Sequence, residues 1–247
     1  MNRLFIYGCA LVAAALSAQP APTTTDVINR ARATLGSEKT LDAVVTLRML
    51  ATLDPVDPKV PEATVLIFAR KPCSQRLEIR VDDMVETTIL KGRKACIIRS
   101  TLGVEASQMR ELTDAELRRV RYSTRQLFNF YRPDFKRGEK VTYEGTVTHR
   151  EQRAHKIKYK YSEGPETVRF FSVKEDVLIA SISDDGVESV NRGEQVVAGI
   201  KYPQSTDYYE AGRMLHTIYL QEISVNQPLP AGIFDVPTAP KNEPGHQ

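Results

Sequence analysis

Alternation of apolar and polar residues dominates the chain from about residue 45 onward and predicts antiparallel β-strands. Residues 76–81 alternate strictly, with Leu77, Ile79 and Val81 separated by charged residues, as in a strand with one buried and one solvent-facing side. Further alternating segments, separated by turn residues, follow it along the chain: 85–90, 95–99, 141–147, 156–161, 167–173, 178–183, 187–191, 195–197, 206–210 and 215–225. We therefore expect a mainly β protein with some α-helix, whose roughly ten strands form one strongly curved antiparallel sheet, an unclosed β-barrel.

Three segments have the spacing of amphipathic helices. Residues 23–36 place an apolar stripe on one side and end at Gly36, and a second short helix follows Ser37. A capping box at Thr113–Glu116 begins a helix of about 18 residues, which Pro133 ends. These short helices are expected to cover the concave face of the sheet as a lid.

A few helices cannot fill the whole concave face of a strongly curved sheet, so we expect an apolar cavity beneath them. The residues predicted to line this cavity are apolar positions of the strands and of the mid-chain helix: Leu77, Ile79, Val81, Ile89, Ile98, Tyr143, Ile157, Tyr159, Tyr161, Phe170, Leu117, Val120, Leu127, Phe128 and Tyr131. A cavity of this kind would stabilise an acyl chain by about 0.8 kcal/mol for each buried methylene. An ordinary packed core is the alternative interpretation of each residue.

Arginines are concentrated in and after the mid-chain helix: Arg118, Arg119, Arg121, Arg125 and Arg132. A solvated helix face accounts for such a run of charge. The alternative is a basic collar at the cavity mouth that attracts anionic lipid headgroups.

The first residues are typical of a secretion signal, because Arg3 precedes an apolar run over residues 4–16 and Ala18 offers a cleavage position. The run is shorter than the roughly 20 residues of a membrane-spanning helix, although an uncleaved anchor is the alternative. We expect a signal peptide at 1–18, one domain at 19–237, a flexible tail at 238–247 and a soluble protein of the periplasm.

Cys73 and Cys96 would remain after cleavage, in an oxidising compartment that permits a disulfide. A meander would place them on non-neighbouring strands, which lie too far apart for a disulfide. The sequence leaves open a disulfide or two buried thiols.

No motif points to catalysis, a metal or a cofactor. The four histidines include no pair spaced for a helical zinc site, and the cysteines lack CxxC spacing. Phosphate-cradling glycine motifs and the GxSxG motif of serine hydrolases are also absent from the sequence. With 34 basic and 31 acidic residues, the formal net charge of +3 argues against a dedicated nucleic-acid binder. We expect no cofactor and no enzymatic activity, with a hydrolase of scattered catalytic residues as the lesser alternative.

A series of short segments between residues 25 and 237 matches one known family in order and spacing. The segments are Ala33-Thr34-Leu35-Gly36, Arg70-Lys71-Pro72, Arg76-Leu77-Glu78, Leu90-Lys91-Gly92-Arg93, Thr113-Asp114-Ala115-Glu116, Gly199-Ile200-Lys201-Tyr202-Pro203, Glu222-Ile223-Ser224-Val225-Asn226 and Ile233-Phe234-Asp235-Val236-Pro237. Together they resemble the LolA-like group, the periplasmic carriers that sort lipoproteins to the outer membrane.

The resemblance implies an unclosed barrel with a helical lid over a cavity that shields the acyl chains of lipoproteins in transit. It implies a monomer that receives lipoproteins from an inner-membrane release complex and delivers them to an outer-membrane receptor. It also implies a lid latch at the basic residue before a proline, which is Lys71 here, with Arg76 as a further candidate. Carriers of this family generally have Arg at that place, and Lys lacks its bidentate fork. The alternative function is a structural or regulatory envelope protein that binds a protein partner through its sheet and carries no lipid.

Overall fold

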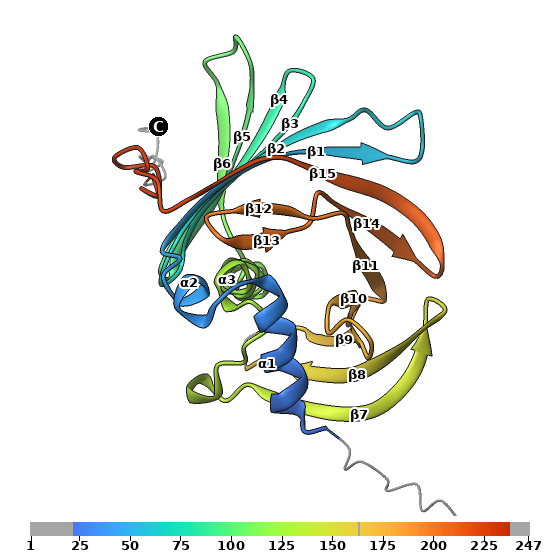
Figure 1. Ribbon diagram of the computed structural model, residues 1–247. Helices are drawn as coiled ribbons and strands as arrows, with labels where there is room; N and C mark the ends of the chain where they lie inside the picture. The colour runs from blue at the N-terminus through green and yellow to red at the C-terminus, as the bar shows by residue number, and fades with distance from the viewer. Residues whose placement is uncertain (1–21, 163, 238–247) are drawn as a thin grey trace, which may run out of the picture.

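One curved antiparallel sheet of 13 strands forms the frame of the protein (Figure 1). The computed structural model describes residues 22–162 and 164–237, so the expected signal peptide 1–18 and tail 238–247 lie outside the described residues. The strand order is β6-β5-β4-β3-β2-β1-β15-β14-β11-β10-β9-β8-β7, and a separate hairpin pairs β12 with β13. The two terminal strands, β6 and β7, do not pair with each other, so the barrel is unclosed, as the sequence predicts.

The strands of the large sheet are β1 (Thr46–Pro55), β2 (Ala63–Arg70), β3 (Ser74–Val81), β4 (Met84–Lys91), β5 (Lys94–Thr101), β6 (Ser107–Glu111), β7 (Lys140–His149), β8 (Gln152–Lys160), β9 (Glu166–Ser172), β10 (Leu178–Ser183), β11 (Val187–Arg192), β14 (Ser205–Glu210) and β15 (Arg213–Val225). The small hairpin consists of β12 (Gln195–Val197) and β13 (Ile200–Tyr202). The helices are α1 (Thr24–Leu35), α2 (Glu38–Asp42), α3 (Asp114–Asn129) and the 3-10 turn η1 (Phe135–Arg137).

The sheet has more strands than the roughly ten expected, because β1, β2 and β6 were not singled out in the sequence. In β1 and β2 apolar residues occupy both faces: register places Ile67 opposite Met49 on one face and Phe68 opposite Arg48 on the other. Apolar residues on both faces hide the two-residue period by which a strand is recognised.

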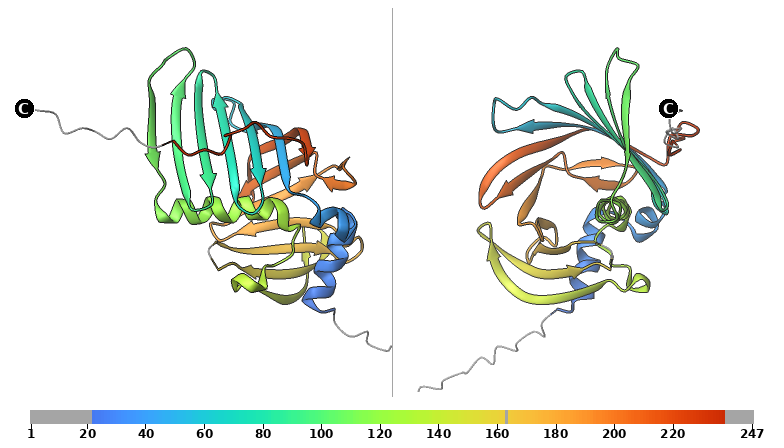
Figure 2. Two further views of the ribbon diagram at one scale, coloured as in Figure 1. Left: turned by 90° about the vertical axis from the view of Figure 1, so that its left-hand side faces the viewer. Right: turned by 180° about the vertical axis from the view of Figure 1, so that it is seen from behind.

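The helices lie on the concave face, and α3 crosses it as the predicted lid (Figures 1 and 2). The expected capping box is present: the Thr113 hydroxyl accepts from the Glu116 N–H at 3.3 Å, and the Glu116 carboxylate accepts from the Thr113 N–H at 2.8 Å. On the facing sheet, Thr124 of α3 donates to the Gln75 side-chain oxygen at 2.5 Å, and both side chains are buried. This contact identifies the face of β3 that carries Gln75 as the concave face.

Two buried clusters fill much of the space between helices and sheet. One packs α2 and the end of α3 against β1, β13 and β15, with Leu41, Leu47, Phe128, Ile200 and Val225 among its members. The other packs the apolar stripe of α1 against β8 and β9: Val27, Ile28, Ala31, Ile157, Tyr159, Tyr161 and Phe171. The helices are therefore held on the concave face by two separate cores, one beneath α2 and the end of α3 and one beneath α1.

The last described residues cross the outer face of the strands that follow β1, as the left view in Figure 2 shows. Phe234 is buried there, with the Arg70 guanidinium 5.0 Å from the centre of its ring. Lys91 of β4 pairs with Asp235 at 2.7 Å. This segment covers part of the outer face, where Ile89 of β4 and Cys96 of β5 are buried.

Candidate ligand-binding cavity

A cavity of about 580 Å³ lies where α1, α3, the β12–β13 hairpin and the concave face of the sheet approach one another. Its volume falls within the roughly 300–1,000 Å³ of ordinary small-ligand sites. Most of its lining is apolar or aromatic and comes from α1, β1, α3 and the turn after it, β10 and the residue before it, and β13: Leu35, Leu47, Met49, Leu127, Phe130, Tyr131, Val177, Leu178 and Tyr202. The side chains of the chain itself therefore do not fill the concavity completely.

Two further hollows, of about 430 and 590 Å³, have a different character. Charged and polar side chains dominate their walls, among them Arg150, Glu175 and Arg192 in the first and Glu38, Asp42 and Arg132 in the second. An apolar ligand would bury more apolar surface in the cavity of about 580 Å³ than in these two polar hollows.

Arg169 of β9 is the most unusual residue in the cavity wall, because its side chain is charged yet the residue is only 8% exposed. Its guanidinium carbon lies 4.4 Å from the ring centre of Tyr159 and 5.4 Å from that of Tyr131. Its Nη2 donates to the side-chain oxygen of Gln126 on α3 at 2.9 Å. Arg169 thus joins the barrel wall to the lid.

Three buried donors in the lining residues lack a hydrogen-bond partner within the described part of the chain. They are Nη1 of Arg169, Nε2 of Gln126 and the hydroxyl of Tyr202. Burial raises the pKa of Tyr202 to about 12, so its hydroxyl keeps its proton at neutral pH and is able to donate. Such groups usually have a partner, because an unpaired buried donor costs about 1–3 kcal/mol.

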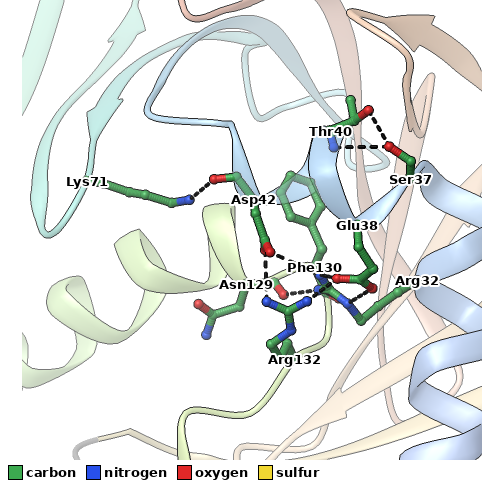
Figure 3. A network of polar contacts seen from close by, with 9 residues as sticks. All are labelled: Arg32, Ser37, Glu38, Thr40, Asp42, Lys71, Asn129, Phe130 and Arg132. Carbon is green, nitrogen blue, oxygen red and sulfur yellow. Dashed lines mark hydrogen bonds and ion pairs between the residues drawn. The ribbon is translucent and has the colours of Figure 1, made fainter.

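The C-terminus of the lid helix is fixed by Arg32 of α1, which is 1% exposed (Figure 3). Its Nη1 donates to the main-chain oxygens of Asn129 and Phe130, each at 2.7 Å. Its Nε and Nη2 donate to the carboxylate of Glu38 at 2.8 Å each. The last carbonyls of a helix lack intrahelical donors and carry partial negative charge, so a buried guanidinium suits this place.

Arg132, just beyond α3, adds a second link to α2 (Figure 3). It pairs with Asp42 at 2.8 Å and with Glu38, which therefore lies between two guanidinium groups. The hydrogen bond from Arg32 and its positive charge, with that of Arg132, hold the pKa of Glu38 below its ordinary value. The three helices are thus joined by one polar network at the end of α3.

Among residues 22–162 and 164–237, no three His, Cys, Asp or Glu side chains are grouped as metal ligands. No helix in those ranges has the length and apolar character required to cross a bilayer.

Two solved structures share most of this architecture. A DUF1329 family protein from Desulfovibrio piger superposes with a TM-score of 0.57 at 8% identity, over 85% of this chain and 96% of that one. A LolA superfamily protein from Nitrosomonas europaea superposes with a TM-score of 0.55 at 10% identity, over 87% and 98%. This chain has a LolA-like fold. No family model and no curated protein matches the sequence.

In this LolA-like fold Lys71 lies at the turn before β3, beside the helices (Figure 3). Its Nζ donates to the main-chain oxygen of Asp42 at 3.2 Å and lies 5.7 Å from the ring centre of Phe128 on α3. Burial lowers the pKa of Lys71. Lys71 therefore contacts both α2 and the lid, and its role as a latch stays a prediction.

Arg76, the second latch candidate, lies on the other side of the sheet. It follows the concave-facing Gln75 in β3, so its side chain points to the outer face. There it pairs with Glu78 at 2.6 Å. The prediction that Arg76 latches the lid was wrong, because alternation along the strand directs it away from α3.

Of the residues predicted to line the cavity, Leu127 and Tyr131 do so. Ile157, Tyr159 and Tyr161 face inward but are buried beneath α1, with Tyr143 packed against them. Phe128 is buried in the other cluster, with Leu41 and Leu47. The remaining predicted positions on the concave side are partly buried outside this cavity: Leu77, Ile79, Val81, Leu117 and Val120. The packed-core interpretation holds for Ile157, Tyr159 and Tyr161 and for Phe128.

Three of the predicted lining residues lie on the outer face. Ile89 is directly opposite Arg76, and Ile98 is opposite Thr87, whereas Leu77 is opposite Thr88. Phe170 alternates with the inward-facing Arg169 and stacks on His149 at 3.8 Å between ring centres. These assignments were wrong because buried outer-face residues have the same apolar character as inner ones.

Cys73 and Cys96 are both free and buried. The Cys73 sulfur lies 3.9 Å from the main-chain oxygen of Arg121 on α3, whereas Cys96 lies on the outer face, opposite Ile89. Of the two alternatives that the sequence left open, the structure has two buried thiols.

The arginines of the lid do not act as one group. Arg118 and Arg119 are exposed, whereas Arg121 and Arg125 are partly buried and Arg132 pairs with α2. The two residues that matter most here, Arg32 and Arg169, were missed. The available signal was an arginine inside an otherwise apolar stretch, as in Val168-Arg169-Phe170-Phe171.

Proposed function

We propose that this protein binds the acyl chains of lipidated molecules in the cavity beneath α3 and carries them through the periplasm. The observation that carries the proposal is the cavity of about 580 Å³ with an apolar lining, in a barrel that its own side chains leave partly empty. The LolA-like fold and the signal-like first residues support it.

Binding in such a cavity requires no covalent chemistry. Each methylene that leaves water for the cavity contributes about 0.8 kcal/mol, so a chain of several methylenes is held by burial alone. The lid supplies one wall through Leu127 and Phe130, and the sheet supplies another through Leu47 and Met49. A ligand placed there would contact both the lid and the barrel.

We also propose a direction of transport, which rests on the resemblance to LolA-like carriers. Cargo lipoproteins would enter from an inner-membrane release complex and leave to an outer-membrane receptor, with the protein acting as a monomer. The polar network around Arg32 fixes one end of α3, so entry and release would involve the rest of the lid.

Native mass spectrometry of protein purified from the bacterial envelope tests the proposal. We expect co-purified lipid, and uptake of an acylated peptide but not of the same peptide without its acyl chains. Leu127→Arg should abolish uptake, whereas Phe135→Arg, at a residue that is 64% exposed in η1, serves as the matched control. Absence of bound lipid together with no uptake of the acylated peptide would reject the carrier function. Recovery of a protein partner in a pull-down, with no lipid bound to this protein, would favour the partner-binding alternative.

A further inference from the structure

We infer that the cavity selects acyl ligands with an anionic head group, which Arg169 and Gln126 bind where the lid meets the barrel wall. This inference rests on the proposed function, because the apolar lining is taken to hold the acyl tail. It adds a polar end to the site and the chemical class of the ligand.

The charges of the cavity wall point to an anion. Three charged residues line it: Arg169, Glu194 and Lys201. Lys201 and Glu194 pair with each other at 2.9 Å between Nζ and Oε2, and both side chains are about half exposed. Arg169 has no carboxylate within ion-pair distance in the described part of the chain. Among the described residues, the wall therefore carries one buried positive charge without a counter-ion, which is costly in a protein interior unless an anion accompanies it.

Hydrogen bonding at Arg169 supports the same conclusion. Nη2 of Arg169 donates to Gln126, whose side-chain oxygen is thereby used, while Nη1 of Arg169 and Nε2 of Gln126 have no partner among the described residues. A carboxylate or phosphate that replaced the Gln126 oxygen would accept from both guanidinium nitrogens, the bidentate geometry that Arg favours. The Gln126 amide would then donate to the same anion.

The remaining surroundings leave one direction for the ligand tail. The rings of Tyr131 and Tyr159 lie against the guanidinium, at 5.4 and 4.4 Å from its carbon to the ring centres. Leu127 and Leu178 line the cavity next to it, and Leu47 and Met49 of β1 lie across it. In the sheet, β9 and β1 are separated by β10, β11, β14 and β15, so the polar and apolar ends lie on opposite walls.

A binding comparison on the delipidated full protein tests head-group selection without any substitution. The probes are hexadecanoate, hexadecanol and hexadecyltrimethylammonium, which differ in head group but share the tail. We expect hexadecanoate to bind at least about tenfold more tightly than the alcohol, and the cation to bind most weakly. Lysophosphatidic acid distinguishes the two sources of the anion: tighter binding than hexadecanoate indicates a lipid phosphate, and weaker binding a fatty-acid carboxylate.

Substitutions locate the selection at Arg169. Arg169→Met should remove the preference for hexadecanoate over hexadecanol, and Arg169→Lys should retain only part of it, because Lys keeps the charge but lacks the fork. The control is Arg153→Met, at an exposed arginine of β8. Gln126→Leu should also reduce the preference for hexadecanoate over hexadecanol. This variant tests the site if Arg169→Met does not fold.

The outcomes separate this inference from the function on which it rests. Equal affinity for all three probes would overturn head-group selection but leave acyl binding intact. A preference that survives Arg169→Met in folded protein would also overturn it. No binding of any probe would reject the carrier function itself.

Discussion

Nη1 of Arg32 lies 2.7 Å from the main-chain oxygen of Phe130, beneath the C-terminus of the lid helix. Phe130 has left-handed backbone angles, φ 46° and ψ 54°, which end α3 and turn its last carbonyls toward α1. One buried side chain thus satisfies a helix end that would otherwise expose unpaired oxygens to the interior. We therefore expect the position of the lid to depend on this buried contact more than on the exposed ion pairs.

Arg32→Met should lower the free energy of unfolding by about 3 kcal/mol, because it leaves the buried Phe130 carbonyl and the partly buried Asn129 carbonyl without this donor. Arg32→Lys should recover little, since an ammonium does not reproduce the guanidinium fork. Urea denaturation measures both. Arg30→Met is the matched control on the same helix: Arg30 pairs with Asp176 at 2.9 Å in a solvent-exposed position, so its loss should cost no more than about 1 kcal/mol. Equal losses for Arg30 and Arg32 would contradict the proposed anchoring.

Leu127 and Phe128 are neighbours on α3 with different surroundings, since Leu127 lines the cavity and Phe128 is buried in the core. Leu127→Ala should weaken binding of an acylated peptide about tenfold, because the lost side-chain area is worth about 1–2 kcal/mol. Phe128→Ala should instead lower the free energy of unfolding by about 3–5 kcal/mol. Titration of ligand and thermal melts of both variants compare the two effects. Should both variants lose binding and stability in equal proportion, the distinction between lid lining and core fails.

The capping box of α3 predicts a dependence on pH. Hydrogen bonds from Arg110 and from Thr113 lower the pKa of Glu116 from 4.5 to about 2. Since the folded value lies below the unfolded one, ionised Glu116 stabilises the fold above about pH 4.5, and that contribution disappears as the pH falls to about 2. Glu116→Gln should therefore be less stable than wild type near pH 6 and equal to it near pH 2. Denaturation at several pH values checks this, with Glu62→Gln, in the exposed segment between β1 and β2, expected to follow wild type.

Both thiols should resist modification in the folded protein. Burial raises the pKa of Cys96, which disfavours its reactive thiolate, and Cys73 is buried, so a reagent in solution does not reach its sulfur. Iodoacetamide should label both cysteines only after the protein is denatured, and this labelling should require no reducing agent. Peptide mass mapping locates the label. Val56→Cys, at a residue that is 55% exposed, provides a thiol that is labelled in the native state. A peptide linking Cys73 to Cys96 in a non-reduced digest would contradict two free thiols.

The local patterns of the sequence predicted much of the fold. Strict alternation at Arg76–Val81 corresponds to β3, and the capping box at Thr113 begins α3 as expected. Both signals are local, because the two-residue period and the cap involve residues close together in the chain.

The site was harder to predict, because the face of a strand depends on distant segments. Ile89 is buried on the outer side, where the chain near Phe234 returns 145 residues later to cover the sheet. Arg169 and Gln126 are 43 residues apart, and no pattern in either segment indicates that they meet. The periodicity therefore identified strands but could not assign each residue to the cavity.

β6 and β7 are the two ends of the sheet in space but neighbouring strands in the chain, joined through α3. The 16 residues of α3 span about 24 Å as a helix, and a helix hardly stretches. From β6 this helix runs back across the sheet, with Thr124 on Gln75 of β3 and Phe128 in one cluster with Leu47 of β1. It therefore acts as a brace of fixed length across these strands, and a turn inserted into or deleted from α3 would shift its end out of register with β1.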